Sequence, residues 1–322
     1  MIITERKSSM EIIERIKSSK TSLPIFCTGS HWNTEAILLA AKNIGQKYQI
    51  RNVPVAIAMT YNYEHMPQAQ RITSTKDARL GFLSMIKHLQ VLADDPGSPY
   101  YGVYVLPHLD HANPVRDKWA LTEGTEFMAS VMFDAQKYPL KENLELTTEY
   151  VKNYGKKVLI EGIMDELSVF QTHEKHASNI ADDYPARAYD YVKKTNIDFL
   201  VADLGTEQQS QGIGKSTYLK GRARNIQKLL NDRKLVLHGT SCLSDEEISS
   251  LPDDGILRVN MWTRIARDAG LYAYDQLVKR GDKIKKNDFN SIESHHYLMD
   301  SIDKASSIME GIMESLGYNN LS

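Results

Sequence analysis

Short apolar runs alternate with longer amphipathic segments along the whole chain. Eight of these runs are rich in apolar and β-branched residues without strict alternation, a pattern typical of strands buried on both faces. The predicted strands cover residues 23–27, 53–59, 102–108, 130–135, 157–163, 198–204, 234–238 and 256–260. Amphipathic segments lie between them, most clearly over residues 34–44, 77–93 and 141–154. This alternation predicts an α/β protein with a (β/α)8 TIM barrel fold.

An open, doubly wound sheet is the alternative, but no glycine-rich dinucleotide-binding sequence follows the first predicted strand. The 322 residues fit one barrel with insertions, or two modest domains. We expect a single TIM-barrel domain over residues 1–322 with extra terminal helices. A C-terminal helical segment is predicted at about 285–318, because apolar residues recur there at helical spacing: Leu298, Ile302, Ala305, Met309, Ile312 and Leu316. It would pack on the barrel, and it could also form an oligomer contact.

The composition limits the cellular locations and binding partners that we expect for the protein. It is 42% hydrophobic and 25% charged, an ordinary globular balance, and the net charge of −2 argues against a nucleic-acid or membrane-surface partner. No apolar stretch is long enough to span a membrane, and the N-terminus lacks a signal-peptide pattern. Cys27 and Cys242 are too few for a disulfide framework. We therefore expect a cytoplasmic protein.

The chemistry points to the ends of the predicted strands. His108-Leu109-Asp110-His111 follows the apolar run 103–106, where we expect the third strand to end. In an α/β barrel the carboxyl ends of the strands form the catalytic face. An imidazole there can hold a divalent metal while an adjacent carboxylate transfers protons. The motif therefore predicts metal-assisted chemistry on a small polar substrate.

Four segments at strand ends carry a resemblance to a known family: 108–111 on the third strand, 130–135 on the fourth, 235–241 on the seventh and 259–263 on the eighth. In this order they resemble the motifs of the class II, metal-dependent fructose-bisphosphate and tagatose-bisphosphate aldolases, and the resemblance covers roughly residues 8–265. The resemblance implies that His111 and His238 bind the metal, and that Asp110 transfers the proton of the substrate hydroxyl at the cleaved bond. The metal would polarise the substrate carbonyl and stabilise an enediolate. Homodimers or homotetramers are usual in the family.

The sequence departs from the family pattern on the catalytic face. A third metal-binding histidine is expected on the sixth-strand loop, where this chain has Gln208 preceded by Glu207. Glu207 would give an ordinary His2Glu zinc site, whereas the amide oxygen of Gln208 would suit Mn²⁺ or Mg²⁺ better than zinc. Zinc is the first expectation, and metal binding could also be lost. Other positions differ as well. Ile163 stands where the family has a carboxylate, Thr240 and Cys242 replace two glycines that cradle the phosphate, and Trp262 replaces an aspartate.

Further polar residues are candidates for substrate contacts. Ser241 and Thr263 could donate to a substrate phosphate together with backbone N–H groups around Gly239, Lys215 could reach the same anion, and Asn260 could bind substrate hydroxyls.

Two carboxylates at strand ends complete the candidate set. Asp134 and Glu161 could orient His111 or hold a second ion, or they could be polar residues of the barrel interior.

Three functions remain open. The first is an aldolase-like carbon–carbon lyase that acts on a sugar or sugar phosphate other than fructose 1,6-bisphosphate. The second is a metal-dependent isomerase or epimerase. The third is a non-catalytic barrel that binds a sugar phosphate or supports a partner subunit, which the missing histidine and the missing strand-eight aspartate would explain.

Overall fold

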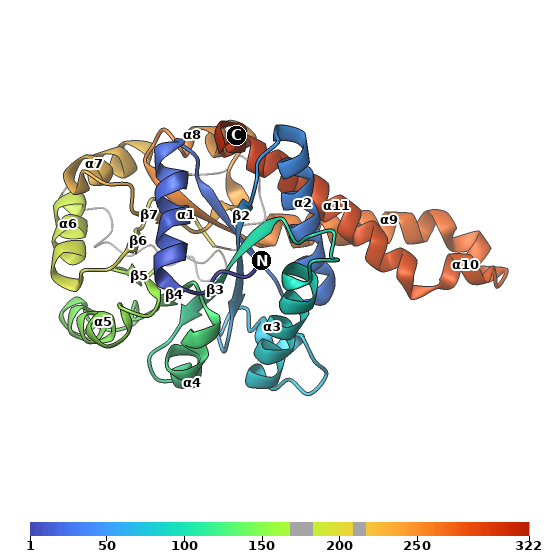
Figure 1. Ribbon diagram of the computed structural model, residues 1–322, viewed down its shortest axis with the longest axis horizontal. Helices are drawn as coiled ribbons and strands as arrows, with labels where there is room; N and C mark the ends of the chain where they lie inside the picture. The colour runs from blue at the N-terminus through green and yellow to red at the C-terminus, as the bar shows by residue number, and fades with distance from the viewer. Residues whose placement is uncertain (168–182, 209–216, 322) are drawn as a thin grey trace.

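Eight parallel strands close into a barrel in a computed structural model, which describes residues 1–167, 183–208 and 217–321 (Figure 1). Each strand pairs with its neighbours in chain order, and β8 pairs with β1. The strands are β1 (Leu23–Cys27), β2 (Val53–Thr60), β3 (Val103–Ala112), β4 (Ser130–Phe133), β5 (Leu159–Ile163), β6 (Phe199–Val201), β7 (Leu235–Leu237) and β8 (Ile256–Met261). The predicted TIM barrel is confirmed, and every predicted strand overlaps an observed one.

One strand boundary differs from the prediction in a way that matters for the site. We expected the third strand to end at residue 108, with Asp110 and His111 beyond it, but β3 continues to Ala112. The reason is that β2 offers a partner for the extra residues, since Thr60 pairs with Asp110. The motif therefore belongs to the strand itself and is held by the sheet.

Helices surround the barrel, and their positions follow the amphipathic segments of the sequence. Predicted segments 34–44, 77–93 and 141–154 correspond to α2, α3 and α5. The helices are α1 (Arg6–Ser18), α2 (His31–Tyr48), α3 (Ala78–Asp94), α4 (Lys118–Leu121), α5 (Leu140–Tyr154), α6 (Tyr184–Thr195), α7 (Lys220–Leu230), α8 (Asp245–Ser250), α9 (Thr263–Lys285), α10 (Phe289–Ile292) and α11 (Ser294–Ser315). None of the described helices combines the length and the apolar character that a membrane span needs.

Helix α1 lies against the amino-terminal ends of the strands. Arg6 forms a two-bonded ion pair with Asp198, which precedes β6, at 2.7 and 2.8 Å, and also donates to the carbonyl of Val158 ahead of β5. Asp198 in turn accepts from the N–H of Ile160. This end of the barrel is therefore tied together by structural contacts, which leaves the carboxyl ends of the strands as the open face.

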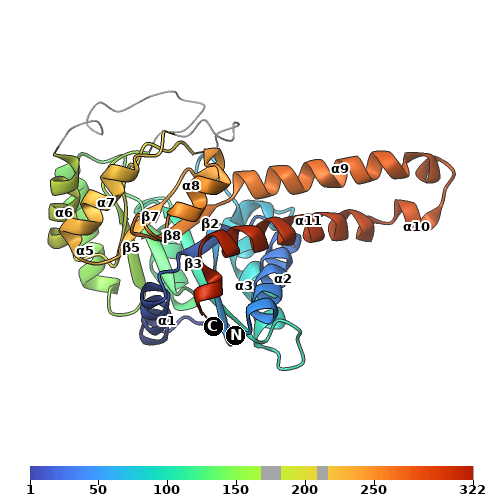
Figure 2. The same ribbon diagram turned by 90° about the horizontal axis from the view of Figure 1, so that it is seen from above.

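Helices α9 and α11 run side by side and extend away from the barrel, with α10 at the far end (Figures 1 and 2). The barrel-proximal part of α11 buries Ile302, Ala305, Met309 and Ile312, and Glu310 accepts a hydrogen bond from Asn43 of α2 at 2.8 Å. Leu298, which continues this apolar series, is 46% exposed because it lies on the extension. Five of the six residues of the predicted apolar stripe, all but Leu298, are therefore buried.

Candidate active site

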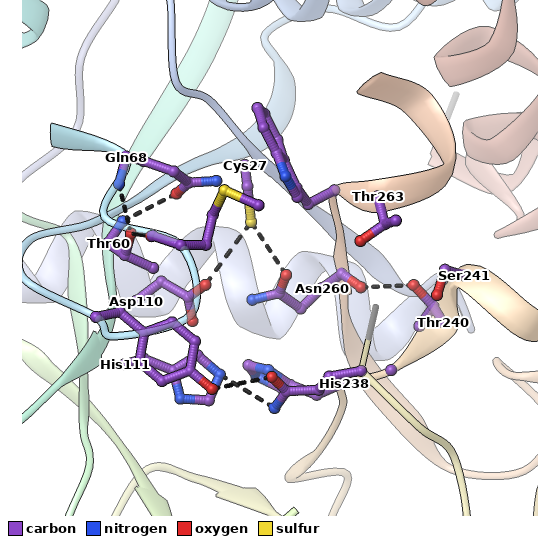
Figure 3. A pocket seen from close by; sticks show the side chains of 15 residues that line it. Cys27, Thr60, Gln68, Asp110, His111, His238, Thr240, Ser241, Asn260 and Thr263 are labelled. Atoms are coloured by element: carbon purple, nitrogen blue, oxygen red, sulfur yellow. Dashed lines mark hydrogen bonds between the residues drawn. The ribbon is translucent and has the colours of Figure 1, made fainter. Parts of the chain in front are cut away.

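A pocket opens where the strands end, and it gathers most of the candidate residues. Eight of them line it: Asp110, His111, Gln208, His238, Gly239, Ser241, Asn260 and Thr263. They come from β3, from β8 and the start of α9, and from the segments that follow β6 and β7, so residues far apart in the sequence converge at one edge of the barrel (Figure 3). This is the face on which TIM barrels carry their active sites.

Asp110 and His111 reach the pocket together because the backbone is irregular at that point. Successive side chains of a regular strand point to opposite faces. Here His111 has a left-handed φ of 47°, and the β3–β4 register shifts between Leu109 and Ala112. Such a conformation costs a non-glycine residue free energy and is typical of functional sites. As a result, ligand atoms of Asp110, His111 and His238 all lie within 4.8 Å of one another.

Both histidines are oriented by a carboxylate behind them. His111 Nδ1 lies 2.8 Å from Asp134 Oδ2, so the neutral imidazole carries its N–H on Nδ1 and its lone pair on Nε2. His238 Nε2 lies 3.4 Å from Glu161 Oε1. Burial alone would lower the pKa of His111, but the neighbouring Asp110 and Asp134 carboxylates outweigh it and raise that pKa. The pairing of histidine with carboxylate is the arrangement that fixes the ring of a metal ligand.

Glu161 lies deeper in the barrel, below the pocket. It is fully buried and accepts from Arg258 at 2.6 Å, and the guanidinium also donates to the hydroxyl of Ser130 at 3.0 Å. That hydroxyl lies 2.8 Å from His108 Nδ1. Burial would raise the pKa of Glu161, yet Arg258 and the nearby histidines lower it to about 2. Burial and Arg258 lower the pKa of His108 to about 4, so this imidazole is neutral.

The two candidates on the sixth-strand loop differ in position. Gln208 is 9% exposed and lines the pocket, with its amide nitrogen 3.4 Å from His111 Nε2. Glu207 does not line the pocket; its backbone lies against Gly239, where an added Cβ would come within 2.8 Å of it. Gly239 also has a φ of 70°, so glycine is required there. Lys215 lies outside the described residues.

Several polar atoms in the pocket are buried and have no protein partner among the described residues. They are Asp110 Oδ1, Asn260 Nδ2 and Ser241 Oγ. Buried polar groups are nearly always hydrogen-bonded, so such atoms beside a cavity indicate groups that pair with a ligand. One is an acceptor, one is a donor, and the serine hydroxyl can be either, which suits a substrate that carries hydroxyl groups.

Sequence reasoning missed part of the pocket wall. Five further residues line the pocket: Cys27, Thr60, Tyr63, Met66 and Gln68. Thr240 and Trp262 also line it, and the sequence had marked them only as departures from the family pattern. Cys27 and Thr60 end β1 and β2, so the strand-end rule applied to all strands would have found them.

The thiol of Cys27 lies at the back of the pocket. Its Sγ is 3.1 Å from Asn260 Oδ1 and 3.7 Å from Asp110 Oδ2 (Figure 3). Burial and the nearby Asp110 raise the pKa of this thiol well above its usual range, so it remains a donor.

Comparisons with known proteins agree with this arrangement. The family model described as "Fructose-bisphosphate aldolase class-II" matches residues 7–320, so the chain belongs to the class II fructose-bisphosphate aldolase family. A fructose-bisphosphate aldolase of Helicobacter pylori is 33% identical over 165 residues, which are 48% of this chain and 51% of that protein. A 6-phospho-5-dehydro-2-deoxy-D-gluconate aldolase of Shouchella clausii is 29% identical over 186 residues, 57% and 60% of the two chains.

The first of these alignments spans about half the length of the curated relative. Solved structures agree over nearly the whole chain. A fructose-bisphosphate aldolase of Campylobacter jejuni has a TM-score of 0.78 at 18% identity and covers 100% of this chain and 97% of its own. The YdjI aldolase of Escherichia coli has a TM-score of 0.66 at 16% identity, with 99% and 98% covered. At these identities the structures support the fold alone.

Proposed function

We propose that the protein is a metal-dependent aldolase that breaks or forms a carbon–carbon bond in a sugar or sugar phosphate other than fructose 1,6-bisphosphate. The observation that carries the proposal is the convergence of Asp110, His111 and His238 in one pocket, where Asp110 Oδ1 has no protein partner among the described residues. Membership of the aldolase family supports the same reaction class.

The residues present fit a divalent cation. His111 directs the lone pair of Nε2 toward the pocket because its other ring nitrogen, Nδ1, is hydrogen-bonded to Asp134, and Glu161 orients His238. Gln208 reaches the same place, whereas Glu207 does not line the pocket, so Gln208 is the proposed third ligand. When bound, the cation would supply the Lewis acidity that polarises a substrate carbonyl and stabilises the charge developing on it. Zinc suits the imidazoles, and the amide oxygen would also accept Mn²⁺ or Mg²⁺.

Asp110 is the proposed acid and base. One of its carboxylate oxygens lies 3.7 Å from the Cys27 thiol, and the other has no partner among the described residues and is buried beside the pocket. In cleavage it would take the proton of the substrate hydroxyl at the bond that breaks, and in the reverse direction it would return that proton. Asn260 and Ser241 would hold substrate hydroxyls through their unpaired donors, with Thr263 and the backbone at Gly239 beside them.

The wall formed by the eighth strand and its loop supports a substrate other than the family's usual one. Trp262 stands where the family has an aspartate, and its ring lies so close to Gly29 that an added Cβ there would come within 3.3 Å. Thr240 is tied to the Asn260 carbonyl by its hydroxyl at 2.7 Å. These side chains fill space that the family pattern leaves to glycines and a carboxylate, so the substrate end bound there should differ in shape or charge.

The first test is the metal content of protein purified without chelators. About one equivalent of zinc or manganese per chain is expected in the native protein and should be lost in His238→Ala. His31→Ala, which changes an exposed histidine at the start of α2, is the matched control and should keep its metal. A retro-aldol screen against phosphorylated ketoses then identifies the substrate. No metal after incubation with excess Zn²⁺ and Mn²⁺ would overturn the proposal and favour a non-catalytic binding barrel.

We also propose a cytoplasmic homodimer or homotetramer built from a single barrel domain with added terminal helices. Exposed apolar side chains on the α9 extension support an oligomer contact, since Leu271, Tyr274 and Val278 are each at least 59% exposed. Light scattering of the purified protein measures this, and a monomer at micromolar concentration would contradict it.

A further inference from the structure

Tyr63 forms two contacts at the centre of the pocket, and neither was anticipated from the sequence. Its ring stacks on the His111 imidazole with 4.3 Å between centroids and an angle of 9°. Its hydroxyl lies 3.1 Å from Gln208 Oε1 and donates to it. Tyr63 is 8% exposed, so both contacts are buried. The side chain therefore touches both His111 and the residue that replaces the third histidine.

The orientation of the Gln208 amide follows from the state of His111. In the neutral ring Nδ1–H donates to Asp134, so Nε2 carries only a lone pair, which pairs with a hydrogen-bond donor. The amide nitrogen of Gln208, at 3.4 Å, supplies that donor, which leaves the amide oxygen for Tyr63. In this orientation the N–H of Gln208 engages the lone pair with which His111 would bind a cation. A cation at His111 therefore requires the amide to turn and present its oxygen.

We propose that Tyr63 is a positioning residue of the metal centre, holding the Gln208 amide in either of two orientations so that a cation can recruit the amide oxygen in place of a third imidazole. This inference rests on the proposed function. A phenol hydroxyl both donates and accepts, so it can pair with Oε1 before the turn and with Nε2 after it. A buried amide without such a partner would lose a hydrogen bond in one orientation or the other.

With a cation bound, the hydrogen bond between the Gln208 amide and Tyr63 would be stronger in the second orientation than in the first. An amide whose oxygen is bound to a cation is a stronger N–H donor, so its hydrogen bond to the Tyr63 oxygen gains strength on loading. Removing a residue that hydrogen-bonds to a metal ligand typically lowers metal affinity by about 10- to 100-fold. Tyr63 should accordingly favour the loaded state, and its ring should also keep the His111 imidazole in place.

The test measures binding of Mn²⁺ and of Zn²⁺ alone by calorimetry, using chelator-treated full-length protein. Tyr63→Phe keeps the stacked ring and removes the hydroxyl, and it should weaken Mn²⁺ binding about tenfold. In the Gln208→His background the same change should have an effect within about twofold, because no amide remains to be held. Tyr61→Phe is the matched control: Tyr61 lies on the same loop, is buried, and stacks on Trp119 away from the pocket.

The outcomes separate this inference from the proposed function. If the native protein binds one cation, His238→Ala abolishes binding and Tyr63→Phe has no effect, the inference is wrong and the metal site stands. An equal loss in the native and Gln208→His backgrounds would also overturn it, because the hydroxyl would then act through something other than the amide. If the native protein binds neither ion, the proposed function fails as well. Thermal unfolding of each variant checks that it is folded.

Discussion

Two buried carboxylates in the same barrel have opposite surroundings. Glu161, in the interior, has one oxygen paired with Arg258 at 2.6 Å and the other 3.4 Å from His238. Asp110, about as well buried, has one oxygen 3.7 Å from a thiol and one without a partner among the described residues. A buried carboxylate whose oxygens are both paired stabilises the fold, whereas a buried carboxylate with an unpaired oxygen beside a cavity can bind a ligand. The comparison predicts opposite consequences when each region is altered.

The largest effect is expected at Asp110. Asp110→Asn removes the proposed proton acceptor while keeping the shape of the side chain, so kcat should fall by about 10²- to 10⁴-fold. Because no ion pair is broken, the melting temperature should stay the same or rise. Steady-state kinetics on the ketose found by the retro-aldol screen, together with thermal unfolding, measure both quantities. Activity within tenfold of native would remove Asp110 from the mechanism.

In the interior, the expected loss is of stability. Arg258→Met leaves the buried Glu161 carboxylate without its guanidinium partner, which should destabilise the fold by about 3–5 kcal/mol. Denaturant unfolding measures the change. Adding Glu161→Leu removes the stranded charge and should recover much of the loss, although His238 then lacks its orienting carboxylate and metal affinity should fall. A double variant no more stable than Arg258→Met would show that Glu161 is not what makes the arginine necessary.

A smaller effect depends on pH and involves His108. Its pKa is lowered from 6.5 to about 4 in the folded protein, first by burial and then by Arg258. As pH falls below 6.5 the unfolded chain takes up a proton that the folded chain refuses, so stability is lost between pH 6.5 and about 4. The loss should reach about 3 kcal/mol. In His108→Asn this part of the pH dependence should disappear. If the free energy of unfolding of the native protein and of the variant falls equally with pH across that window, the assignment to His108 is wrong.

The sequence was sufficient for the barrel and for eight of the residues that line the pocket. Doubly buried strands leave a strong apolar pattern, so all eight were found, and strand ends of one barrel face together whatever lies between them. What the pattern does not contain is the backbone irregularity at His111, which turns two successive side chains into one pocket. It also could not tell which of Glu207 and Gln208 lines the pocket, since this depends on how the segment after β6 lies against Gly239. The role of Tyr63 depends on a contact between residues 145 positions apart.

The smallest effect, at Ser241, tests the comparison most directly. Its hydroxyl is buried without a partner among the described residues, unlike that of Ser130, which lies 3.0 Å from Arg258 and 2.8 Å from His108. Removing an unpaired buried hydroxyl relieves a desolvation cost, so Ser241→Ala should leave stability unchanged or raise it by up to about 1 kcal/mol. Ser130→Ala should instead lower stability by about 1–3 kcal/mol, because it strands two buried partners. Denaturant unfolding of the pair under one set of conditions gives both signs. If Ser241→Ala and Ser130→Ala lower the free energy of unfolding equally, the Ser241 hydroxyl contributes to stability as an interior group does. The unpaired atoms would then not mark a ligand site.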